Sequence, residues 1–476
     1  MSLIVIGGGP AGMAAAIEAS RAGMDVTLMD ESPSVGGQIY RELPKTFEVR
    51  EPKALGKDFL RGQQLKQELA AQGQRVQLMS ETEVLGLWPH REVLFASRGR
   101  SGSHVADQVI LATGAYDRPV PIQGWTLPGV MTAGGAQAFV KTMRVRPGRR
   151  ALVAGTGPLL LVVATQLAQA GIEVVAVLEA GHKPPPLAAL GALWGHWGLL
   201  RDAAHYYSRL RQARIPVLYN HAVFRAHGRE AVESVEYGAI NPEDWSPLRS
   251  QWSQAAVDML VVGYGFVPNT QLAFMAGCKH RYALELGGWV PERDALLRTS
   301  VQGIYSAGDG AGVAGSISAT EEGRVAGITA AEAAGALTHE VAEQRRAGPL
   351  KKLRALKRVR TFLDELSRIR PGLARLAEPE TIMCRCEVVT NKDVEFALAQ
   401  GAKDLQAVKL LTRLGMGACQ GCNCAPSTAL HVSQRLGCPL EAVGQIRPRP
   451  PVKPVTLGTL ASDAIEVRST QERSGT

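Results

Sequence analysis

Cysteines gathered in one region are the residues whose spacing most clearly indicates chemistry. The 476-residue chain has seven cysteines, and five of them lie between residues 384 and 424, in the pattern C-x-C followed later by C-x2-C-x-C. Thiolates grouped in this way hold zinc or an iron–sulfur cluster. The first pair is closer in sequence than the C-x2–4-C pairs usual in structural zinc sites. This spacing favours an iron–sulfur electron carrier over zinc, and a metal-free remnant is the third alternative.

The cysteine pattern resembles the bacterioferritin-associated-ferredoxin-like [2Fe-2S] domain, in which a C-x-C pair and a later pair hold the cluster. This resemblance implies three ligands: Cys384, Cys386 and Cys419. The fourth ligand is open between Cys422 and Cys424. We favour Cys424, because residues 415–421 resemble the same stretch of flavoprotein relatives that use a C-x4-C pair.

A glycine-rich loop near the N-terminus has the spacing of a dinucleotide-binding turn. An apolar strand precedes the G-x-G-x-x-G pattern, and a helical run follows it. Gly7 permits the tight turn, Gly9 lets the backbone approach a pyrophosphate, and Gly12 lets helix and strand pack closely. Pro10 and Ala11 open the helix, whose N-terminus presents free N–H groups to the phosphates.

An acidic residue follows the next strand, which we expect over residues 25–29. Asp30 lies about 20 residues beyond the glycines, where a carboxylate accepts hydrogen bonds from a ribose diol. Glu31 is the alternative for the same role. Strand, loop, helix, strand and acid occur in this order, which predicts a dinucleotide site and not merely a structural turn.

Three further turns favour FAD as the dinucleotide. The first is a Gly-Gly-Gln turn just after the acid, the second ends a buried strand, and the third ends a strand in Gly-Asp, whose carboxylate can bind a ribityl hydroxyl. The candidate contacts are Gly37, Gln38, Ala112, Thr113, Gly114, Gly308 and Asp309. Together these motifs resemble the flavoproteins with two dinucleotide-binding domains, which include glutathione-reductase-like enzymes.

A second strand–loop–helix–strand unit begins near residue 151. Gly155 and Gly157 repeat the first two glycines, and Glu179 repeats the acid. Leu160 stands at the third glycine position, where its side chain would push helix and strand apart or fill space near a pyrophosphate. We therefore expect an NAD(P)-like domain that binds a nucleotide such as ATP or NAD without hydride transfer, or binds nothing. Use of NAD(P)H is the less favoured alternative.

Other catalytic patterns are missing from the sequence. Disulfide reductases of this type carry two neighbouring cysteines beside the flavin, but no cysteine precedes Cys278, which excludes dithiol chemistry there. Cys278 and Cys438 are isolated and are predicted to be buried or inert thiols. The histidines, among them His196 and His205, lie in no recognisable catalytic motif. We predict no catalytic residue in this chain.

The motifs and the families they resemble imply an α/β fold with two Rossmann-like dinucleotide-binding domains, glutathione-reductase-like, and a small helical [2Fe-2S] domain. The 51 glycines fit many tight strand-to-helix turns. We predict a discontinuous FAD-binding domain at 1–118 and 275–335, an NAD(P)-like inserted domain at 119–274, a basic helical linker at 336–380, the [2Fe-2S] domain at 381–440 and a Pro-rich tail at 441–476. Pro349 and Pro371 are expected to interrupt the linker helix.

Charge and hydropathy restrict partners and location. The net charge is +9, and part of it lies in the basic segment 345–375. No recognition motif accompanies this charge, so we expect no nucleic acid and interpret the segment as a solvated helix face or a docking surface for an acidic protein. The sequence shows no signal peptide and no apolar run long enough to span a membrane. We expect a cytoplasmic protein, free or peripheral at the inner face of the membrane.

The order of motifs from residue 7 to 424 resembles the larger α-type subunits of opine oxidases, hydrogen cyanide synthase, and proline or D-hydroxyproline dehydrogenases. The resemblance implies an oxidoreductase subunit for CH-NH donors in a heteromer. An FAD-dependent, amine-oxidase-like β subunit would oxidise the substrate, FMN would lie at the α–β interface, and a small ferredoxin-like γ subunit would complete the assembly. This chain would relay electrons through FAD and [2Fe-2S] to an acceptor.

Two other functions are compatible with the residues. One is a stand-alone NAD(P)H-dependent FAD reductase that uses the second unit. The other is a structural subunit whose nucleotides and cluster only stabilise the assembly. Rapid bleaching of the flavin by NADH would favour the first, and a cluster that cannot be titrated would favour the second.

Overall fold

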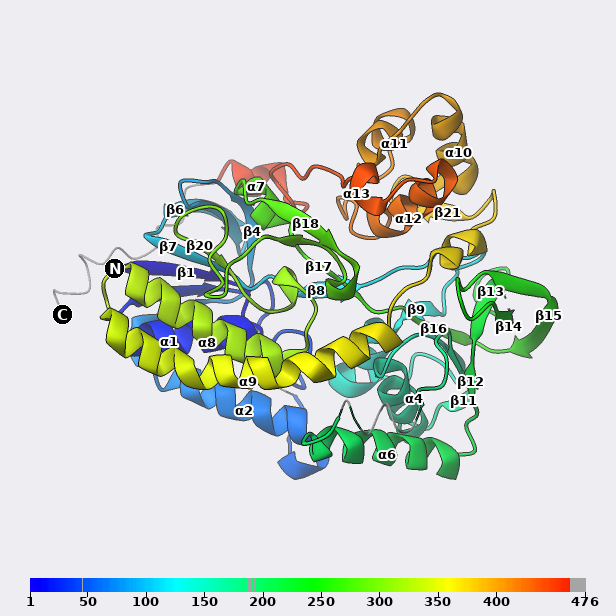
Figure 1. Ribbon diagram of the computed structural model, residues 1–476, viewed down its shortest axis with the longest axis horizontal. Coiled ribbons are helices and arrows are strands. Elements are labelled where there is room, and N and C mark those ends of the chain that lie inside the picture. The colour runs from blue at the N-terminus through cyan, green and yellow to red at the C-terminus, as the bar shows by residue number, and fades with distance from the viewer. Residues whose placement is uncertain (45, 186–190, 192, 463–476) are drawn as a thin grey trace. The chain divides into compact units, whose positions relative to one another are not determined.

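Two parallel five-stranded sheets organise the chain (Figure 1). The computed structural model describes all residues except 45, 186–190, 192 and 463–476. The chain divides into two units by its internal packing. Unit 1 contains residues 1–116, 268–357 and the segment from 447 onward, and unit 2 contains residues 117–267 and 358–446.

The sheet of unit 1 is parallel throughout, with strand order β20-β7-β1-β2-β3. Its first strand is a continuous buried apolar run, as is usual in parallel sheets, whose two faces are both covered. The strands are β1 (Ser2–Ile6), β2 (Asp25–Met29), β3 (Val76–Met79), β7 (Gln108–Leu111) and β20 (Ile304–Ser306).

Helices α1 (Pro10–Arg21) and α8 (Ser316–Ala333) pack closely against each other in unit 1. Two glycines of α8 allow this approach. A β-carbon on Gly323 would overlap the carbonyl oxygen of Ala11, and one on Gly327 would overlap atoms of Ala15. The position of α1, and of the loop that precedes it, therefore depends on small residues in a helix more than 300 positions later in the sequence.

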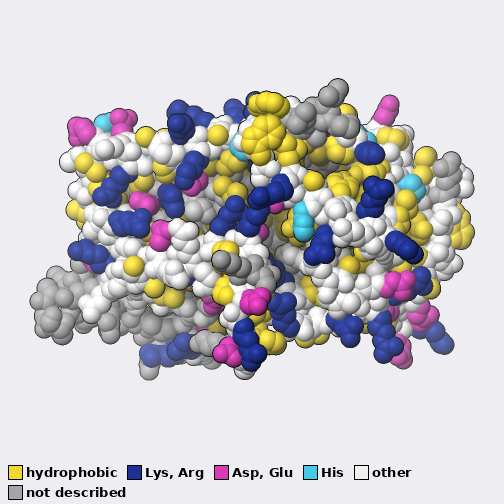
Figure 2. Space-filling view, turned by 90° about the horizontal axis from the view of Figure 1, so that it is seen from below, with side chains coloured by type: hydrophobic (Ala, Val, Ile, Leu, Met, Phe, Trp, Pro, Cys, Tyr) yellow, Lys and Arg dark blue, Asp and Glu magenta, His cyan; other side chains and the backbone are white. Residues whose placement is uncertain are grey.

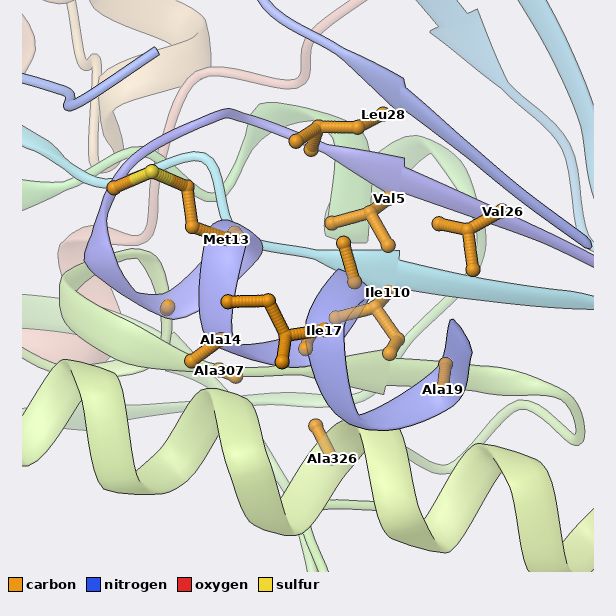
Figure 3. Close-up of a cluster of buried hydrophobic side chains, with 14 of the residues drawn as sticks. Val5, Met13, Ala14, Ile17, Ala19, Val26, Leu28, Ile110, Ala307 and Ala326 are labelled. Carbon is orange, nitrogen blue, oxygen red and sulfur yellow. The ribbon is translucent and has the colours of Figure 1, made fainter. Parts of the chain in front are cut away.

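An apolar core joins α1 to the strands of the first sheet. Figure 3 shows side chains from β1, β2, β7, α1 and α8 meeting there. The core includes Val5, Met13, Ile17, Val26 and Ile110, each no more than 2% exposed. Burial of an aliphatic side chain contributes about 1.5–3 kcal/mol. This core therefore holds the first turn of α1 firmly at the carboxyl end of β1.

A three-stranded antiparallel sheet and several short elements complete unit 1. The backbone N–H of Thr82, at the start of β4, donates to the carbonyl oxygen of Asp30 over 2.9 Å, so this sheet begins beside the end of β2. The elements are β4 (Thr82–Leu87), β5 (Glu92–Ser97), β6 (Arg100–Val105), α2 (Lys57–Ala70), α7 (Gln271–Met275), β18 (His280–Ala283), β19 (Gly288–Pro291) and α14 (Leu457–Leu460).

Unit 2 repeats the pattern of a parallel sheet with covering helices, in the strand order β12-β11-β10-β16-β9. The strands are β9 (Val130–Thr132), β10 (Arg150–Gly155), β11 (Glu173–Glu179), β12 (Val217–Tyr219) and β16 (Met259–Gly263). Beside them lie α4 (Leu159–Gln169), α6 (Trp197–Gln212) and the antiparallel strands β13 (His221–His227), β14 (Ser234–Ile240) and β15 (Pro247–Ala256).

The cysteine-rich region of unit 2 is a small helical bundle with its own buried core. Helix α10 begins with a capping box, in which the side chains of Thr390 and Asp393 each accept from the other's backbone N–H. Its elements are β21 (Ile382–Cys384), β22 (Val389–Thr390), α10 (Asn391–Ala399), α11 (Leu405–Thr412), α12 (Ala425–Leu436) and α13 (Leu440–Val443).

The prediction that Pro349 interrupts the basic helix was wrong. Helix α9 runs from His339 to Leu366 and includes Pro349. A proline removes one backbone hydrogen bond, but ion pairs hold the helix on both sides of it. The guanidinium of Arg346 pairs with Glu332, and the Lys352 ammonium lies 2.9 Å from a carboxylate oxygen of Glu321. Pro371 follows the helix and opens a short 3-10 turn.

The face drawn in Figure 2 carries both basic and acidic side chains. Figure 2 shows Lys and Arg side chains scattered over one face, with acidic side chains between them. Within α9, Arg360 pairs with Asp364 over 2.7 Å, so part of the positive charge of the segment is offset locally. Among the described residues, no helix has the length and apolar character needed to cross a bilayer.

Candidate functional site

The first glycine loop lies between β1 and α1. Of the three glycines in its pattern, only Gly9 has open space where a β-carbon would be. A β-carbon on Gly7 would overlap the carbonyl oxygen of Ala112, and one on Gly12 would overlap that of Gly7. A β-carbon on Gly9 would find no atom nearer than the Cα of Gly37, at 3.8 Å. Two glycines therefore serve backbone packing, while Gly9 leaves room for a group that approaches the helix N-terminus.

The two acidic residues after β2 have different surroundings. Asp30 is buried, and its Oδ2 accepts from the N–H of Gly8 over 2.5 Å while its Oδ1 accepts from the N–H of Ser32 over 2.8 Å. Because each carboxylate oxygen has two lone pairs, Asp30 retains acceptor capacity for a ribose diol. Glu31 is half exposed and forms an ion pair with Lys453.

The turn after these acids reaches the first loop. The backbone N–H of Gly36 donates to the carbonyl oxygen of Gly8 over 2.8 Å, and a β-carbon on Gly37 would lie 2.9 Å from the Cα of Gly9. Gln38 is exposed, and its Oε1 accepts from the guanidinium of Arg41 over 2.7 Å. The structure thus brings Gly37, but not the side chain of Gln38, against the first loop.

The turns after β7 and β20 meet at the carboxyl edge of the same sheet. The N–H of Ala112 donates to the carbonyl oxygen of Ile6 over 2.8 Å. A β-carbon on Gly310 would contact Thr113 and Gly114, and one on Gly308 would lie 2.8 Å from the β-carbon of Ala11. In open α/β sheets, ligands bind at this edge. The predicted FAD contacts Ala112, Thr113, Gly114 and Gly308 therefore lie at the same edge of the sheet as the first glycine loop.

Asp309 is held by the start of helix α8. Its Oδ1 accepts from the N–H groups of Ala314 and Gly315, over 2.8 and 3.0 Å. These bonds fix the carboxylate in the turn that follows β20. A fixed carboxylate at the end of a strand can accept a hydrogen bond from a hydroxyl group without losing further side-chain freedom.

One buried ion pair at this edge was missed by the sequence analysis. Glu322 is buried, and its carboxylate accepts from the N–H of Gly308 over 2.8 Å and from two guanidinium nitrogens of Arg293 over 2.7 and 2.9 Å. The pair supports the backbone of the 308–311 turn. No local sequence pattern marks it, because its partners are 29 residues apart and lie on different elements.

The second glycine loop also has its acid in place. The Oε2 of Glu179 accepts from the N–H of Gly157 over 3.0 Å, and its Oε1 accepts from the N–H of Gly181 over 2.8 Å. Burial raises the pKa of Glu179 to about 7. The side chain of Leu160 is buried, and a β-carbon on Gly263 would lie 3.1 Å from its Cδ2. Because Gly263 of β16 has no side chain, there is room for Leu160 at the third glycine position.

The end of helix α9 lies on this second loop. A β-carbon on Gly157 would lie 2.7 Å from the hydroxyl oxygen of Ser367, and the Thr156 hydroxyl donates to the carbonyl oxygen of Leu366 over 3.4 Å. At Gly9, the corresponding position of the first loop, the space is open. The two loops share a sequence pattern but differ in whether a group can approach them.

Four of the five clustered cysteines form two contacting pairs. The thiol of Cys424 hydrogen-bonds to the sulfur of Cys384, which lowers the pKa of Cys384 to about 5 and raises the pKa of Cys424. Cys386 and Cys419 form the second pair, with a backbone and a side-chain hydrogen bond between them. Cys422 is half-buried in the turn that separates Cys419 from Cys424.

These thiols are closely packed, and the residues beside them contact Trp125 of unit 2. A β-carbon on Gly417 would overlap the β-carbon of Cys386. The guanidinium of Arg385 lies over the ring of Trp125, 5.3 Å from its centroid, and the Trp125 indole N–H donates to the carbonyl oxygen of Ile382 over 2.7 Å. Searched over the described residues, His, Cys, Asp and Glu side chains form no group of three or more with the arrangement of a metal site.

Comparison with known proteins identifies the family. The model of the pyridine nucleotide-disulphide oxidoreductases matches residues 1–335. The chain belongs to this family. A second model, the sarcosine oxidase A3 domain, matches residues 381–464. The first family implies a flavin, FAD, as cofactor, and residues 1–335 include every predicted FAD contact.

Relatives that match almost the whole chain are subunits of oxidoreductases. The chain is 33% identical to hydrogen cyanide synthase subunit HcnB of Pseudomonas protegens, over 98% of both chains. It is 35% identical to an opine oxidase subunit of Agrobacterium tumefaciens, over 96% of this chain and 91% of the relative. These matches confirm the family predicted from the sequence motifs.

A solved structure supports the fold. L-proline dehydrogenase from P. horikoshii superposes with a TM-score of 0.70, covering 97% of this chain and 79% of that one at 24% identity. At this identity the match establishes the fold alone. The prediction of an α/β flavoprotein with Rossmann-type domains is confirmed.

Proposed function

We propose that this chain is the electron-transferring FAD/[2Fe-2S] subunit of a heteromeric dehydrogenase for amino or imino acids. The observation that carries the proposal is the pairing of four thiols, Cys384 with Cys424 and Cys386 with Cys419, in a chain of a flavoprotein family. When bound, FAD supplies two-electron chemistry and a [2Fe-2S] cluster supplies one-electron chemistry. A chain that holds both is suited to pass electrons from a substrate-oxidising partner to an acceptor.

For FAD, the residues of unit 1 fit the role. Gly9 leaves space at a helix N-terminus for the pyrophosphate, and Asp30 offers a fixed carboxylate to the ribose. Gly37 and Gly308 bring two further turns against the same loop. We assign the contacts to Gly7, Gly9, Pro10, Ala11, Gly12, Asp30, Gly37, Ala112, Thr113, Gly114, Gly308 and Asp309.

For the cluster, we assign Cys384, Cys386, Cys419 and Cys424 as ligands. Each hydrogen-bonded pair joins one cysteine of the first C-x-C motif to one of the second cysteine group. In sequence, 32 residues separate these two groups, from Cys386 to Cys419. A [2Fe-2S] cluster takes four thiolates, so it would replace the two thiol hydrogen bonds by bonds to iron. This assignment leaves Cys422 outside the ligand set, and we propose a [2Fe-2S] domain at 381–440.

The names of the relatives support a proposal about partner subunits. The relatives are named as subunits, and some carry the names of opine and sarcosine oxidases. We propose that an FAD-dependent β subunit oxidises the C–N bond of the substrate, with FMN at the α–β interface and a small γ subunit in the assembly. In this proposal the chain supplies cofactor binding and leaves substrate chemistry to the partner.

A stand-alone NAD(P)H-dependent reductase is the competing function. It requires access to the second glycine loop, where Ser367 lies against Gly157. That contact supports the electron-transfer subunit over the reductase. Addition of NADH to the purified flavoprotein discriminates between them, because rapid bleaching of the flavin would establish the reductase.

Two matched cysteine variants test the ligand set. Cys424→Ser should lose most of the iron and the visible absorption of the cluster after anaerobic reconstitution, whereas Cys422→Ser should retain both. Both variants should bind FAD like the unaltered chain, because the FAD residues lie in unit 1. Full iron retention in Cys424→Ser, or zinc in place of iron in the unaltered chain, would contradict the proposal.

A further inference from the structure

The C-terminal segment, residues 447–462, packs beside the predicted ribose site of unit 1. The N–H of Val452 donates to the carbonyl oxygen of Leu85 in β4 over 3.0 Å, and the side chain of Val452 is 6% exposed. It belongs to the same buried core as Met29, the last residue of β2. Proline residues around this position keep the segment free of helix up to residue 456.

A second contact anchors the segment farther along. The N–H of Ser101 in β6 donates to the hydroxyl oxygen of Ser462 over 3.1 Å, just beyond helix α14. The segment therefore meets the antiparallel sheet of unit 1 at two strands. The strand β4, which the segment meets at Leu85, begins at Thr82 with a hydrogen bond to the carbonyl oxygen of Asp30.

This path places Lys453 at the two acidic residues. Its ammonium group forms an ion pair with Glu31, and its side chain is two-thirds buried. Burial lowers the pKa of Lys453, and the charge of Asp30 opposes that shift. The buried carboxylate of Asp30 and the half-exposed carboxylate of Glu31 are consecutive in the chain, so Lys453 provides positive charge where two negative charges meet.

We propose that Lys453 is a positioning residue of the FAD site. Asp30 and Glu31 stand beside the place assigned to the adenosine ribose of FAD, and the adjoining pyrophosphate is anionic. An unpaired Glu31 would repel that ligand, and Lys453 offsets its charge. The C-terminal segment thereby becomes part of the cofactor site, although it lies more than 400 residues from the glycine loop in sequence.

The inference rests on the proposed FAD site, and the affinity of the chain for FAD tests it directly. The full-length chain is stripped of flavin, and FAD is titrated by the quenching of its fluorescence. Lys453→Met, which keeps the length of the side chain and removes its charge, should bind FAD about fivefold more weakly. Lys453→Arg should stay close to the unaltered chain. Arg449→Met is the matched control, because Arg449 is an exposed cation of the same segment.

A double variant tests the cause. If Lys453 acts by neutralising Glu31, the combination of Lys453→Met with Glu31→Gln should bind FAD within about twofold of Glu31→Gln alone. An equal loss in both backgrounds would overturn the electrostatic explanation. Unaltered affinity in Lys453→Met would overturn the inference, and a fall only in the melting temperature of the flavin-free chain would do so as well. Failure of the unaltered chain to bind FAD would instead contradict the proposed function.

Discussion

Replacement of Gly9 by alanine should separate cofactor binding from folding. Gly9 is the N-cap residue of α1 and has φ of −73°, which alanine adopts without strain. A β-carbon there would meet no atom nearer than 3.8 Å. The folded chain without flavin should therefore tolerate the substitution, whereas a ligand pyrophosphate would collide with the new methyl group.

The size of each effect follows from these contacts. Alanine is a poorer N-cap than glycine by roughly 0.5–1 kcal/mol, but it lowers the entropy of the unfolded chain by a similar amount, about 0.4–1 kcal/mol. The two terms largely cancel. Displacement of the pyrophosphate would remove about two charge-assisted hydrogen bonds worth about 1.5–3 kcal/mol each. FAD should thus bind about 100-fold more weakly or worse.

The assay compares two glycines of the same loop. The melting temperature of the flavin-free Gly9→Ala chain should stay within about 4 °C of the unaltered chain, and its FAD affinity should fall. Gly12→Ala should instead destabilise the flavin-free chain, because its β-carbon would overlap the carbonyl oxygen of Gly7. Unaltered FAD affinity in Gly9→Ala would refute the assignment of the loop to the pyrophosphate.

Three further outcomes are expected. Because burial raises the pKa of Glu179 to about 7, the folded state binds more protons than the unfolded state between about pH 4.5 and 7, and the contribution of Glu179 to stability falls as the pH rises through that window. Between about pH 4.5 and 7, Glu179→Gln should reduce the change in the free energy of unfolding by roughly 1–3 kcal/mol. Urea unfolding at several pH values measures this, and the same dependence on pH in both proteins would contradict the prediction. Gly323→Ala should destabilise unit 1 by about 1–3 kcal/mol, because its β-carbon overlaps Ala11. Gly198→Ala, at an exposed position of helix α6 with open space around it, should be neutral or stabilising, and equal melting temperatures of the two variants would count against the close packing of α1 and α8. Arg293→Met leaves the buried carboxylate of Glu322 without its guanidinium and should cost about 3 kcal/mol, so a loss below about 1 kcal/mol in denaturant unfolding would show that the pair is not structurally important.

Local patterns predicted the parts of the molecule that depend on neighbours in sequence. The strand expected over residues 25–29 is β2, because the continuous run Val-Thr-Leu-Met of apolar and β-branched residues fits a parallel strand buried on both faces. The first glycine loop adopts its expected place between β1 and α1, since glycine and proline restrict the turn directly. The chemistry of the loop could thus be inferred before its surroundings were known.

Contacts between distant segments were beyond local patterns. The helix-breaking tendency of Pro349 is opposed by the ion pairs of Arg346 and Lys352 with α8 and by the packing of Leu350 and Leu353 on the core of unit 1. The space for Leu160 depends on Gly263, and the contact on Gly157 depends on Ser367. Each effect is a property of packing between elements that are far apart in the chain, and propensity or motif spacing carries no information about it.

The position of Lys453 illustrates the same limit at the cofactor site. From sequence alone, the Pro-rich tail at 441–476 has no assigned neighbour. In the structure, Val452 is buried against unit 1 and Lys453 pairs with Glu31. The buried valine determines where the lysine lies, so the charge at the ribose site follows from an apolar contact.

A reductive titration of the anaerobically reconstituted chain tests the central claim most directly. A chain that holds one FAD and one [2Fe-2S] cluster should take up about three electrons, two at the flavin and one at the cluster, and the reduced cluster should give a paramagnetic resonance signal. Uptake of about two electrons, with no such signal and no iron in the reconstituted protein, would contradict the assignment of this chain as an electron-transferring subunit.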